Sequence, residues 1–426
     1  MRKVILTQPG HIHPFNEPAR DLRVHNKPLW LWQRDLLTPY TTEEREYPGW
    51  EVTKMALAGQ QAETLVLQDN LFFNDYLIAE FMSRAREGQR PARLAFRRDD
   101  PAIAEHVLPL THSFVETGDL VMAGIWYLPE GVEQADSCRP LVIDTESRER
   151  GYYHIPPYMA SETGDLVYQL PRKAFVMVES WMHLFIIDIL FGAFARGADV
   201  EDRVAGDWRY RLKILWRAML EQKQVLDCSE LVKIGRNVTI DPSAVIHGPT
   251  TIGDNVSIGP GAVIDNCIIG NNVNISQGCQ LMLSVVNDGC FLPFRAALFM
   301  TTLMENTMVA QNTCLQLCVV GRDSFIGAGT TFTDFNVLPA PLRVFGHGKL
   351  EKTAMYVLGG CVGHHCRLSA GLIIYPARTI ESDVVLLASD KRRFITSSVA
   401  YEESDHHALS QQYPYPRLYP RQGESG

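Results

Sequence analysis

The second half of the chain carries an apolar residue about every six positions. The series runs from Ile234 to Leu386 with a few steps of five and one long interruption, and most of its members are Ile, Leu or Val. Glycine directly follows several of them, and a small or slender residue stands four positions after many. A unit of six residues is too short for a helical repeat and fits a short strand followed by a tight turn. The pattern therefore predicts a solenoid of triangular coils over 233–390.

One residue of each unit is expected to point into the solenoid. The predicted inward positions are Ile234, Ile240, Ile246, Ile252, Ile258, Ile264, Ile269, Ile275, Leu281, Val286, Leu292, Leu298, Leu303, Met308, Cys314, Val320, Ile326, Phe332, Tyr356, Val362, Leu368, Ile374, Ile380 and Leu386. Four cysteines occupy the small-residue slots and are expected in the core, namely Cys279, Cys290, Cys318 and Cys366. The chain has no CxxC pair, which argues against a zinc framework or a disulfide scaffold.

Two segments lie outside the repeat. Residues 333–355 interrupt it, and because connections longer than about 12–15 residues are usually functional or disordered, we expect a protruding loop there. After Leu386 the series stops, and 391–426 is predicted to be a partly disordered tail. Its last part, 411–426, is rich in Pro and Tyr and is expected to lack structure unless it docks on a partner.

Residues 1–200 show no such period and predict a mixed α/β domain. The pattern predicts strands at 3–7 and 92–96, an apolar segment at 63–73 and a helix at 76–88. A connecting helix is expected within 201–232. Its apolar residues Trp208, Leu212, Leu215 and Met219 share one helical face.

Composition narrows the possible partners. The chain is 46% hydrophobic, and 40 Lys+Arg against 49 Asp+Glu give a net charge of −9, so it lacks the basic footprint of a nucleic-acid-binding protein. The most apolar stretch, 181–194, is shorter than the roughly 20 residues of a membrane span, so we expect a buried helix and no membrane partner. The N-terminus lacks the apolar segment of a secretory signal, which favours the cytoplasm.

The repeat resembles the hexapeptide-repeat, left-handed parallel β-helix family. Together with the α/β first half, it is similar to the bifunctional sugar-1-phosphate nucleotidyltransferase/acetyltransferases, and most of all to a divergent bacterial branch of that group. The arginine-rich segment of this branch is echoed by HPFNEPARDLRVHN (13–26), and its tryptophan-containing helix by SWMHLFIID (180–188). The ordinary Gly-rich loop is absent, since Gln8-Pro9-Gly10 follows the first strand. The resemblance therefore implies a degenerate nucleotidyltransferase-like first domain.

Three residues are candidates for nucleotide binding. If the site is retained, the resemblance implies that Arg20 and Arg23 contact phosphate and that Asp69 holds Mg²⁺. The alternative is that these residues form salt bridges at the surface or core edge of a degenerate fold.

Acetyl transfer needs a general base beside the acceptor, usually histidine. The resembling enzymes carry this base in a stretch of the type GHLTYLGD, whereas this chain has CLQLCVVGRD at 314–323. Gln316, which cannot take up a proton, therefore stands in its place. The remaining catalytic candidates are His347 in the loop and the adjacent His364 and His365, which would lie at a coil corner facing a neighbouring subunit of a trimer. The alternative is that all three are solvated or incidental histidines.

The γ-type carbonic anhydrases also use this β-helix. Their zinc is held by three histidines, two of which are spaced H-x4-H. That spacing does not occur in this chain, and the side chains of the adjacent pair His364 and His365 diverge, which argues against a zinc centre.

Two functions remain open at this stage. The first is a transferase of nucleotide-sugar or cell-envelope metabolism, acting as a sugar-1-phosphate nucleotidyltransferase, an acyl-CoA-dependent acyltransferase or both. The resemblance implies a sugar phosphate, nucleotide or acyl-CoA as substrate, Mg²⁺ and acetyl-CoA as cofactors, and a homotrimer. The second is a non-catalytic trimeric scaffold or regulatory protein descended from such enzymes, which Gln316 and the missing Gly-rich loop favour.

The loop histidine leads to a first prediction. If His347 is the general base, His347→Ala abolishes any coenzyme A-dependent transfer and leaves the thermal unfolding transition unchanged. Full activity in this variant, measured as thiol release from acetyl-CoA, would remove His347 from the candidates.

Overall fold

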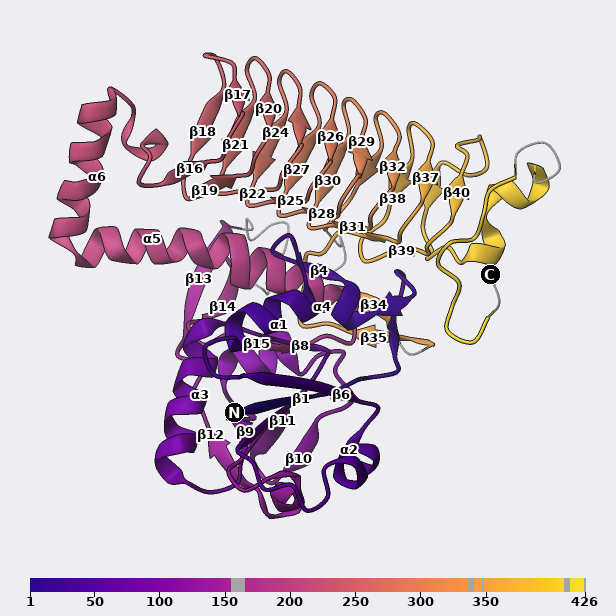
Figure 1. The fold of residues 1–426 in the computed structure, drawn as a ribbon. Coiled ribbons are helices and arrows are strands. Elements are labelled where there is room, and N and C mark those ends of the chain that lie inside the picture. The colour runs from indigo at the N-terminus through magenta and orange to yellow at the C-terminus, as the bar shows by residue number, and fades with distance from the viewer. Residues whose placement is uncertain (155–164, 336–340, 347, 410–413, 425–426) are drawn as a thin grey trace. The chain divides into compact units, whose positions relative to one another are not determined.

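The computed structural model describes residues 1–154, 165–335, 341–346, 348–409 and 414–424 (Figure 1). These residues form two compact units. The first comprises 1–12, 17–154 and 165–183, and the second comprises 13–16 and the described residues from 184 onward.

The first unit ends before position 200, the predicted boundary, because the helix after His183 packs on the solenoid. Thr302 Oγ1 donates a hydrogen bond to Asp188 Oδ2 at 3.2 Å, and both side chains are buried. Arg196 donates to Thr251 Oγ1 at 2.9 Å. These polar contacts and the apolar residues around them place the helix with the second unit.

A mixed sheet forms the core of the first unit. Its strand order is β12-β9-β11-β7-β1-β6, and all strands run parallel except β11. Their bounds are β1 (Arg2–Leu6), β6 (Glu43–Tyr47), β7 (Thr64–Gln68), β9 (Ala92–Arg97), β11 (Leu120–Leu128) and β12 (Arg139–Val142), with β10 (Val115–Thr117) pairing beside β11. The central strand β7 and the Val4–Leu6 part of β1 are mainly apolar and buried on both faces, whereas the edge strand β6, EEREY, is charged and exposed.

Helices and short strands complete the first unit. The helices are α1 (Leu29–Leu37), α2 (Trp50–Ala56) and α3 (Asp75–Gly88), and the short strands are β2 (His11–Ile12), β3 (Glu17–Pro18), β4 (Arg23–Val24), β5 (Lys27–Pro28), β8 (Leu71–Phe73), β13 (Ser147–His154), β14 (Asp165–Pro171) and β15 (Phe175–Met177). Helix α3 begins where the Asn74 side chain accepts a hydrogen bond from Leu77 N at 3.1 Å. This unit confirms the predicted α/β first half.

The second unit contains three parallel sheets of eight strands, which confirms the predicted left-handed β-helix (Figure 1). The first sheet consists of β16 (Val232–Ile234), β19 (Thr250–Ile252), β22 (Ile268–Ile269), β25 (Val285–Val286), β28 (Thr302–Leu303), β31 (Val319–Val320), β36 (Cys361–Val362) and β39 (Thr379–Ile380). The second consists of β17 (Thr239–Ile240), β20 (Ser257–Ile258), β23 (Asn274–Ile275), β26 (Phe291–Leu292), β29 (Met308–Val309), β32 (Phe325–Ile326), β37 (Arg367–Leu368) and β40 (Val385–Leu386). The third consists of β18 (Val245–His247), β21 (Val263–Asp265), β24 (Gln280–Met282), β27 (Ala297–Phe299), β30 (Cys314–Gln316), β33 (Thr331–Phe332), β38 (Ile373–Ile374) and β41 (Phe394–Ile395).

Aliphatic side chains stack along the interior of the solenoid. Ile258, for example, is 2% exposed and pairs with Ile240 in the preceding coil and Ile275 in the next. The predicted small-residue cysteines, Cys279, Cys290, Cys318 and Cys366, are buried free thiols, as expected.

The predicted register is wrong at a few positions. Val309 and Leu315 are fully buried, whereas Met308 and Cys314 are only partly buried, because the chain takes six residues and not five after Leu303. Ile234 is 45% exposed because the first coil has no preceding coil to cover it.

One corner of the solenoid requires a left-handed backbone in every coil. The corner residues, all with φ between 54° and 72°, are Asn237, Asn255, Asn272, Gly289, Asn306, Asp323, His365 and Asp383. Asn, Asp and Gly tolerate this conformation best, and His is also enriched in it. Neighbouring corner side chains form hydrogen bonds, such as Asn237 to Asn255 at 3.1 Å and Asn306 to Asp323 at 3.1 Å. His365 and Asp383 continue this ladder.

The interruption after β33 contains an antiparallel hairpin. Its strands are β34 (Arg343–Gly346) and β35 (Lys349–Lys352), and Phe345 pairs with Leu350. The catalytic candidate His347 lies outside the described residues.

Among the described residues, one continuous helix is long and apolar enough to span a membrane. It runs from Trp181 to Gly206 through α4 (Trp181–Phe185), η4 (Ile186–Phe194) and α5 (Ala195–Gly206), and 72% of its most apolar window is buried inside the protein. The helix is longer than the apolar stretch 181–194, whose predicted burial is confirmed. Such burial is typical of a core helix in a soluble protein.

Helix α6 (Trp208–Glu221) follows α5 and is capped by Asp207, whose side chain accepts hydrogen bonds from Arg209 N and Tyr210 N. Its inner face packs Tyr210, Ile214 and Ala218 against Cys228 and Leu231, beside the first coil. The predicted apolar face of Trp208, Leu212, Leu215 and Met219 exists, but it faces solvent.

The interior stack leads to a prediction about stability. Ile258→Asp places a carboxylate among buried aliphatic groups, which costs several kcal/mol, and we expect the variant to lose the folded solenoid. Ser257→Asp, on the exposed side of the same strand, is the matched control and keeps a cooperative melt in circular dichroism. A cooperative, native-like melt of Ile258→Asp would contradict the assigned register.

Candidate functional sites

The carboxyl ends of three parallel strands bring polar residues together in the first unit. Asp69 is the first residue after β7, Gln8 is the second residue after β1, and Glu46 is the last but one residue of β6. In the sheet, β6 pairs with one side of β1 and β7 with the other, so the strand order reverses at β1. Strand β1 is therefore a topological switch point. Open α/β sheets bind ligands outside the carboxyl ends of their strands at such a point. Asp69 therefore lies at the position where ligands commonly bind in open α/β sheets.

Asp69 is a buried carboxylate with few compensating contacts. It is 2% exposed, and its Oδ1 accepts a hydrogen bond from Gln8 N at 3.0 Å. Its Oδ2 lies 3.7 Å from Arg20 Nη1, too far for a strong hydrogen bond. Burial raises the pKa of Asp69 to about 6, and the hydrogen bond from Gln8 and the charge of Arg20 offset this only in part. The ionised carboxylate is thus held at a cost in stability near neutral pH.

Arg20 connects this carboxylate to a second one. It lies on η1 (Ala19–Asp21) and donates from Nη1 and Nη2 to the two carboxylate oxygens of Glu46, at 3.0 and 2.9 Å. These bonds raise the pKa of Arg20 and lower that of Glu46. Arg23 points to a different partner, the backbone oxygen of Asn26 at 3.0 Å. The structure therefore brings Arg20 and Asp69 together, and the hydrogen bond described for Arg23 goes to Asn26.

Gln33 supports the Asp69 loop and was not predicted from the sequence. Its Nε2 donates to the backbone oxygens of Gln68, Asp69 and Leu71, the last at 2.7 Å. Gln33 is 1% exposed on α1, in line with the buried Leu29 and Leu37. A lone polar residue at the buried spacing of an amphipathic helix is the signal that would have identified it.

The Asp69 site fits Mg²⁺ only in part. Among the described residues no group of three or more His, Cys, Asp or Glu side chains converges as metal ligands. Mg²⁺ is often held by one or two carboxylates together with substrate phosphates and water. A single desolvated carboxylate at this position therefore suits a metal that arrives with a phosphorylated ligand and does not suit a resident metal centre.

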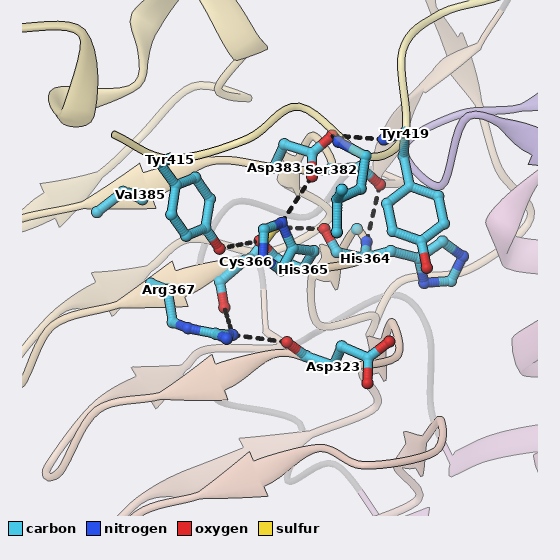
Figure 2. A network of polar contacts seen from close by, with 12 residues as sticks. Asp323, His364, His365, Cys366, Arg367, Ser382, Asp383, Val385, Tyr415 and Tyr419 are labelled. Atoms are coloured by element: carbon cyan, nitrogen blue, oxygen red, sulfur yellow. Dashed lines mark hydrogen bonds and ion pairs between the residues drawn. The ribbon is translucent and has the colours of Figure 1, made fainter. Parts of the chain in front are cut away.

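In the second unit, His365 has the hydrogen-bond geometry of an oriented imidazole (Figure 2). Its Nδ1 donates to Asp383 Oδ1 at 2.8 Å, and its ring stacks on Tyr415 at a centroid distance of 4.4 Å. Asp383 is fully buried, and its Oδ2 accepts from the backbone nitrogens of Leu418 and Tyr419 at 3.0 and 2.7 Å. A carboxylate on Nδ1 directs the lone pair of the neutral ring to Nε2.

His364 occupies a different environment although it is adjacent in sequence. It is fully buried, with its ring 4.9 Å from that of Phe15 and 4.8 Å from that of Tyr419. Its Nδ1 accepts a hydrogen bond from Arg322 N at 2.9 Å. These contacts describe a core residue that holds chain segments together, and its catalytic role stays a prediction without geometric support.

Both ends of the chain dock beside these histidines. The backbone oxygen of Pro14 accepts from Ser382 N and Oγ at 3.0 and 2.9 Å. From the tail, Arg421 Nε donates to the buried Glu381 at 2.7 Å, and Asn16 Nδ2 donates to the same carboxylate at 2.9 Å. The described part of the tail, 414–424, is thus held by this chain's own last coils, whereas the sequence led us to expect docking only on a partner.

Gln316 stands where the resembling acetyltransferases carry their histidine base, and its amide cannot take up a proton. The amide of Gln316, oriented as its neighbours require, donates to both carboxylate oxygens of Asp334 at 3.1 and 2.9 Å. Burial raises the pKa of Asp334. The glutamine is therefore a structural partner of the carboxylate at the start of the interruption.

Comparisons with known proteins agree with the solenoid. The bacterial transferase hexapeptide model (six repeats) matches residues 231–266. Bifunctional protein GlmU of Geotalea uraniireducens (strain Rf4) is 27% identical over 176 residues, which cover 37% of this chain and 38% of that protein. GlmU of Acaryochloris marina (strain MBIC 11017) is 24% identical over 217 residues, 45% of each chain. Gamma carbonic anhydrase 2, mitochondrial, of Arabidopsis thaliana is 24% identical over 198 residues, 44% of this chain and 64% of that protein.

The chain thus carries the hexapeptide repeat of bacterial transferases and resembles the GlmU-like bifunctional enzymes. It spans about two fifths of the length of the GlmU relatives that it matches.

The raised pKa of Asp69 predicts how stability depends on pH. The folded pKa of about 6 lies above the ordinary 3.8, so folding opposes ionisation, and the stability cost develops between pH 4 and 6 and is complete above pH 6. We expect Asp69→Asn to raise the free energy of unfolding by about 2 kcal/mol at pH 8 and to leave this free energy almost unchanged at pH 4. Denaturant titrations at both pH values measure the difference. Asp136→Asn, at an exposed position, is the control. A less stable Asp69→Asn at pH 8 would contradict the prediction.

Proposed function

We propose that the chain is a transferase of nucleotide-sugar or cell-envelope metabolism whose first unit acts as a sugar-1-phosphate nucleotidyltransferase. The observation that carries the proposal is the pairing of Arg20 with the desolvated Asp69, 3.7 Å apart, at the switch point of the sheet. The GlmU relatives support the same class, although they cover only part of the chain.

Arg20 is the proposed phosphate ligand. Its planar guanidinium now binds the two oxygens of Glu46, and a phosphate group presents the same bidentate geometry. When a nucleotide binds, Arg20 exchanges Glu46 for phosphate oxygens, and the exposed side of Glu46 becomes hydrated. The proposed reaction is attack of a sugar phosphate oxygen on the α-phosphorus of the nucleotide, with pyrophosphate leaving.

Asp69 is the proposed ligand for Mg²⁺ that accompanies the nucleotide. Bound Mg²⁺ would neutralise charge that develops on the transferring phosphoryl group. Gln8 N and the Gln33 amide hold the Asp69 loop in place, so the carboxylate needs little reorganisation when it binds. Because a cation favours the ionised carboxylate, Asp69 binds Mg²⁺ best above pH 6.

The solenoid is proposed to assemble three copies of the chain, as the resemblance implies. Acyl transfer from acetyl-CoA in this unit requires a histidine other than position 316. Among the histidines in the described residues, His365 is our candidate. Its Nδ1 is bonded to a buried carboxylate, and its side chain is 12% exposed.

A non-catalytic trimeric scaffold is the alternative, and two observations favour it. Glu46 already neutralises Arg20, and Gln316 replaces the expected base. The two functions differ in whether the first unit binds nucleotides at all.

Ligand-induced thermal shift separates the two functions. We expect one of UTP, dTTP or GTP to stabilise the protein in the presence of Mg²⁺ by about 2.7 kcal/mol at a hundredfold its Kd. Arg20→Ala removes this shift, whereas Arg45→Ala, an exposed arginine on the same edge strand as Glu46, keeps it. No shift with nucleotides, sugar phosphates or acetyl-CoA would establish the scaffold as the better description.

A further inference from the structure

Helix α6 carries two apolar faces, and only one of them is covered. Tyr210, Ile214 and Ala218 form the covered face. The uncovered stripe consists of Trp208, Leu212, Leu215, Trp216, Met219 and Leu220, each between 52% and 61% exposed. Single exposed apolar residues are common, but a contiguous stripe of six large ones marks an interaction surface.

The stripe is flanked by positive charge. The sequence of α6, WRYRLKILWRAMLE, contains four cations and one carboxylate, on a chain whose net charge is −9. At about 100° per residue, Arg211 lies on one side of the stripe, and Lys213 and Arg217 lie on the other. Arg209 falls within the stripe near its N-terminal end, with its guanidinium 5.7 Å from the Trp208 ring. Lys213 forms an ion pair with Glu230 at 2.6 Å, and the Glu221 carboxylate accepts from Ser229 N at 3.0 Å. No ion pair of Arg209, Arg211 or Arg217 is present among the described residues.

The positive charge and the apolar side chains of α6 indicate which kind of partner binds it. A second copy of α6 would bring the arginines of two helices close together, at a cost from like-charge repulsion. An anionic lipid surface offers both complements, with phosphates for the arginines and an apolar region for the stripe. Trp208 and Trp216 have the amphipathic ring that is favoured at the boundary between headgroups and acyl chains.

We propose that α6 docks in the plane of an anionic phospholipid membrane, with its apolar stripe below the headgroups and its arginines on the lipid phosphates. Val225 and Leu226, which follow the helix, are also exposed apolar residues. The sequence led us to expect no membrane partner, because its most apolar stretch is too short to cross a bilayer. That argument concerns insertion across a bilayer and does not apply to a surface helix.

Vesicle co-sedimentation of the full chain tests the proposal. We expect binding to phosphatidylcholine vesicles that contain phosphatidylglycerol, at least tenfold weaker binding to pure phosphatidylcholine, and weakening as salt is raised. The double variant Trp216→Ser/Leu220→Ser should lose binding by tenfold or more. Phe394→Ser, at a residue 57% exposed on the solenoid, is the matched control and should bind like the wild type.

A second variant separates charge from apolar contact. Arg211→Glu/Arg217→Glu keeps the stripe, and we expect it to lose the preference for anionic vesicles. Because these positions are on the solvent face of α6, circular dichroism melts should match the wild type. The proposal is overturned if the wild type binds neither vesicle, or if Trp216→Ser/Leu220→Ser binds as the wild type does. A third result would also overturn it: sedimentation velocity shows that the wild type self-associates, that Trp216→Ser/Leu220→Ser dissociates, and that lipid changes neither.

Discussion

The stack of aliphatic side chains inside the solenoid is the constraint on which the second unit depends. Each strand has only two or three residues, so every coil must return to the same register for its inward side chain to meet those above and below. That requirement sets the left-handed corners, where Asn, Gly and Asp recur from Asn237 to Asp383. His365 and Asp383 meet because they occupy this corner in consecutive coils, and their hydrogen bond continues the ladder that Asn237 and Asn255 begin.

The first unit places its chemistry by the same kind of rule, through strand order. Parallel strands end at a common edge, so Asp69 and Gln8 meet although they are distant in sequence. The Asp69 carboxylate is buried there, accepts a hydrogen bond from the backbone nitrogen of Gln8 and lies 3.7 Å from Arg20. These contacts offset burial only in part, so its pKa is raised. Stability is sacrificed at this position, which is characteristic of residues kept for binding. Glu46 and Arg20, by contrast, satisfy each other, so ligand binding at this edge must break an existing ion pair.

Interactions far apart in sequence also decide where the two chain ends lie. Glu381 is buried between Asn16 near the N-terminus and Arg421 near the C-terminus, and hydrogen bonds from both stabilise its charge. The tail is therefore ordered by the last coils although its composition is typical of unstructured segments. Helix α6 shows the reverse case, because its more hydrophobic face remains in solvent and the face with Tyr210 and Ala218 packs.

The sequence by itself determined the solenoid, since a six-residue period can be read along one dimension and each unit contacts only its neighbours. Through the resemblance it also gave Arg20, Arg23 and Asp69 as candidates for a nucleotide site, whereas the 3.7 Å approach of Arg20 to Asp69 came from the structure. The tertiary structure was needed for the exact register at Val309 and Leu315, for the support from Gln33 and for the hydrogen bond of Arg23 to Asn26. So did the separate environments of His364 and His365, which differ because one ring points into packed aromatic groups and the other onto a buried carboxylate. Contacts of this kind depend on which distant segments meet, and local periodicity carries no information about that.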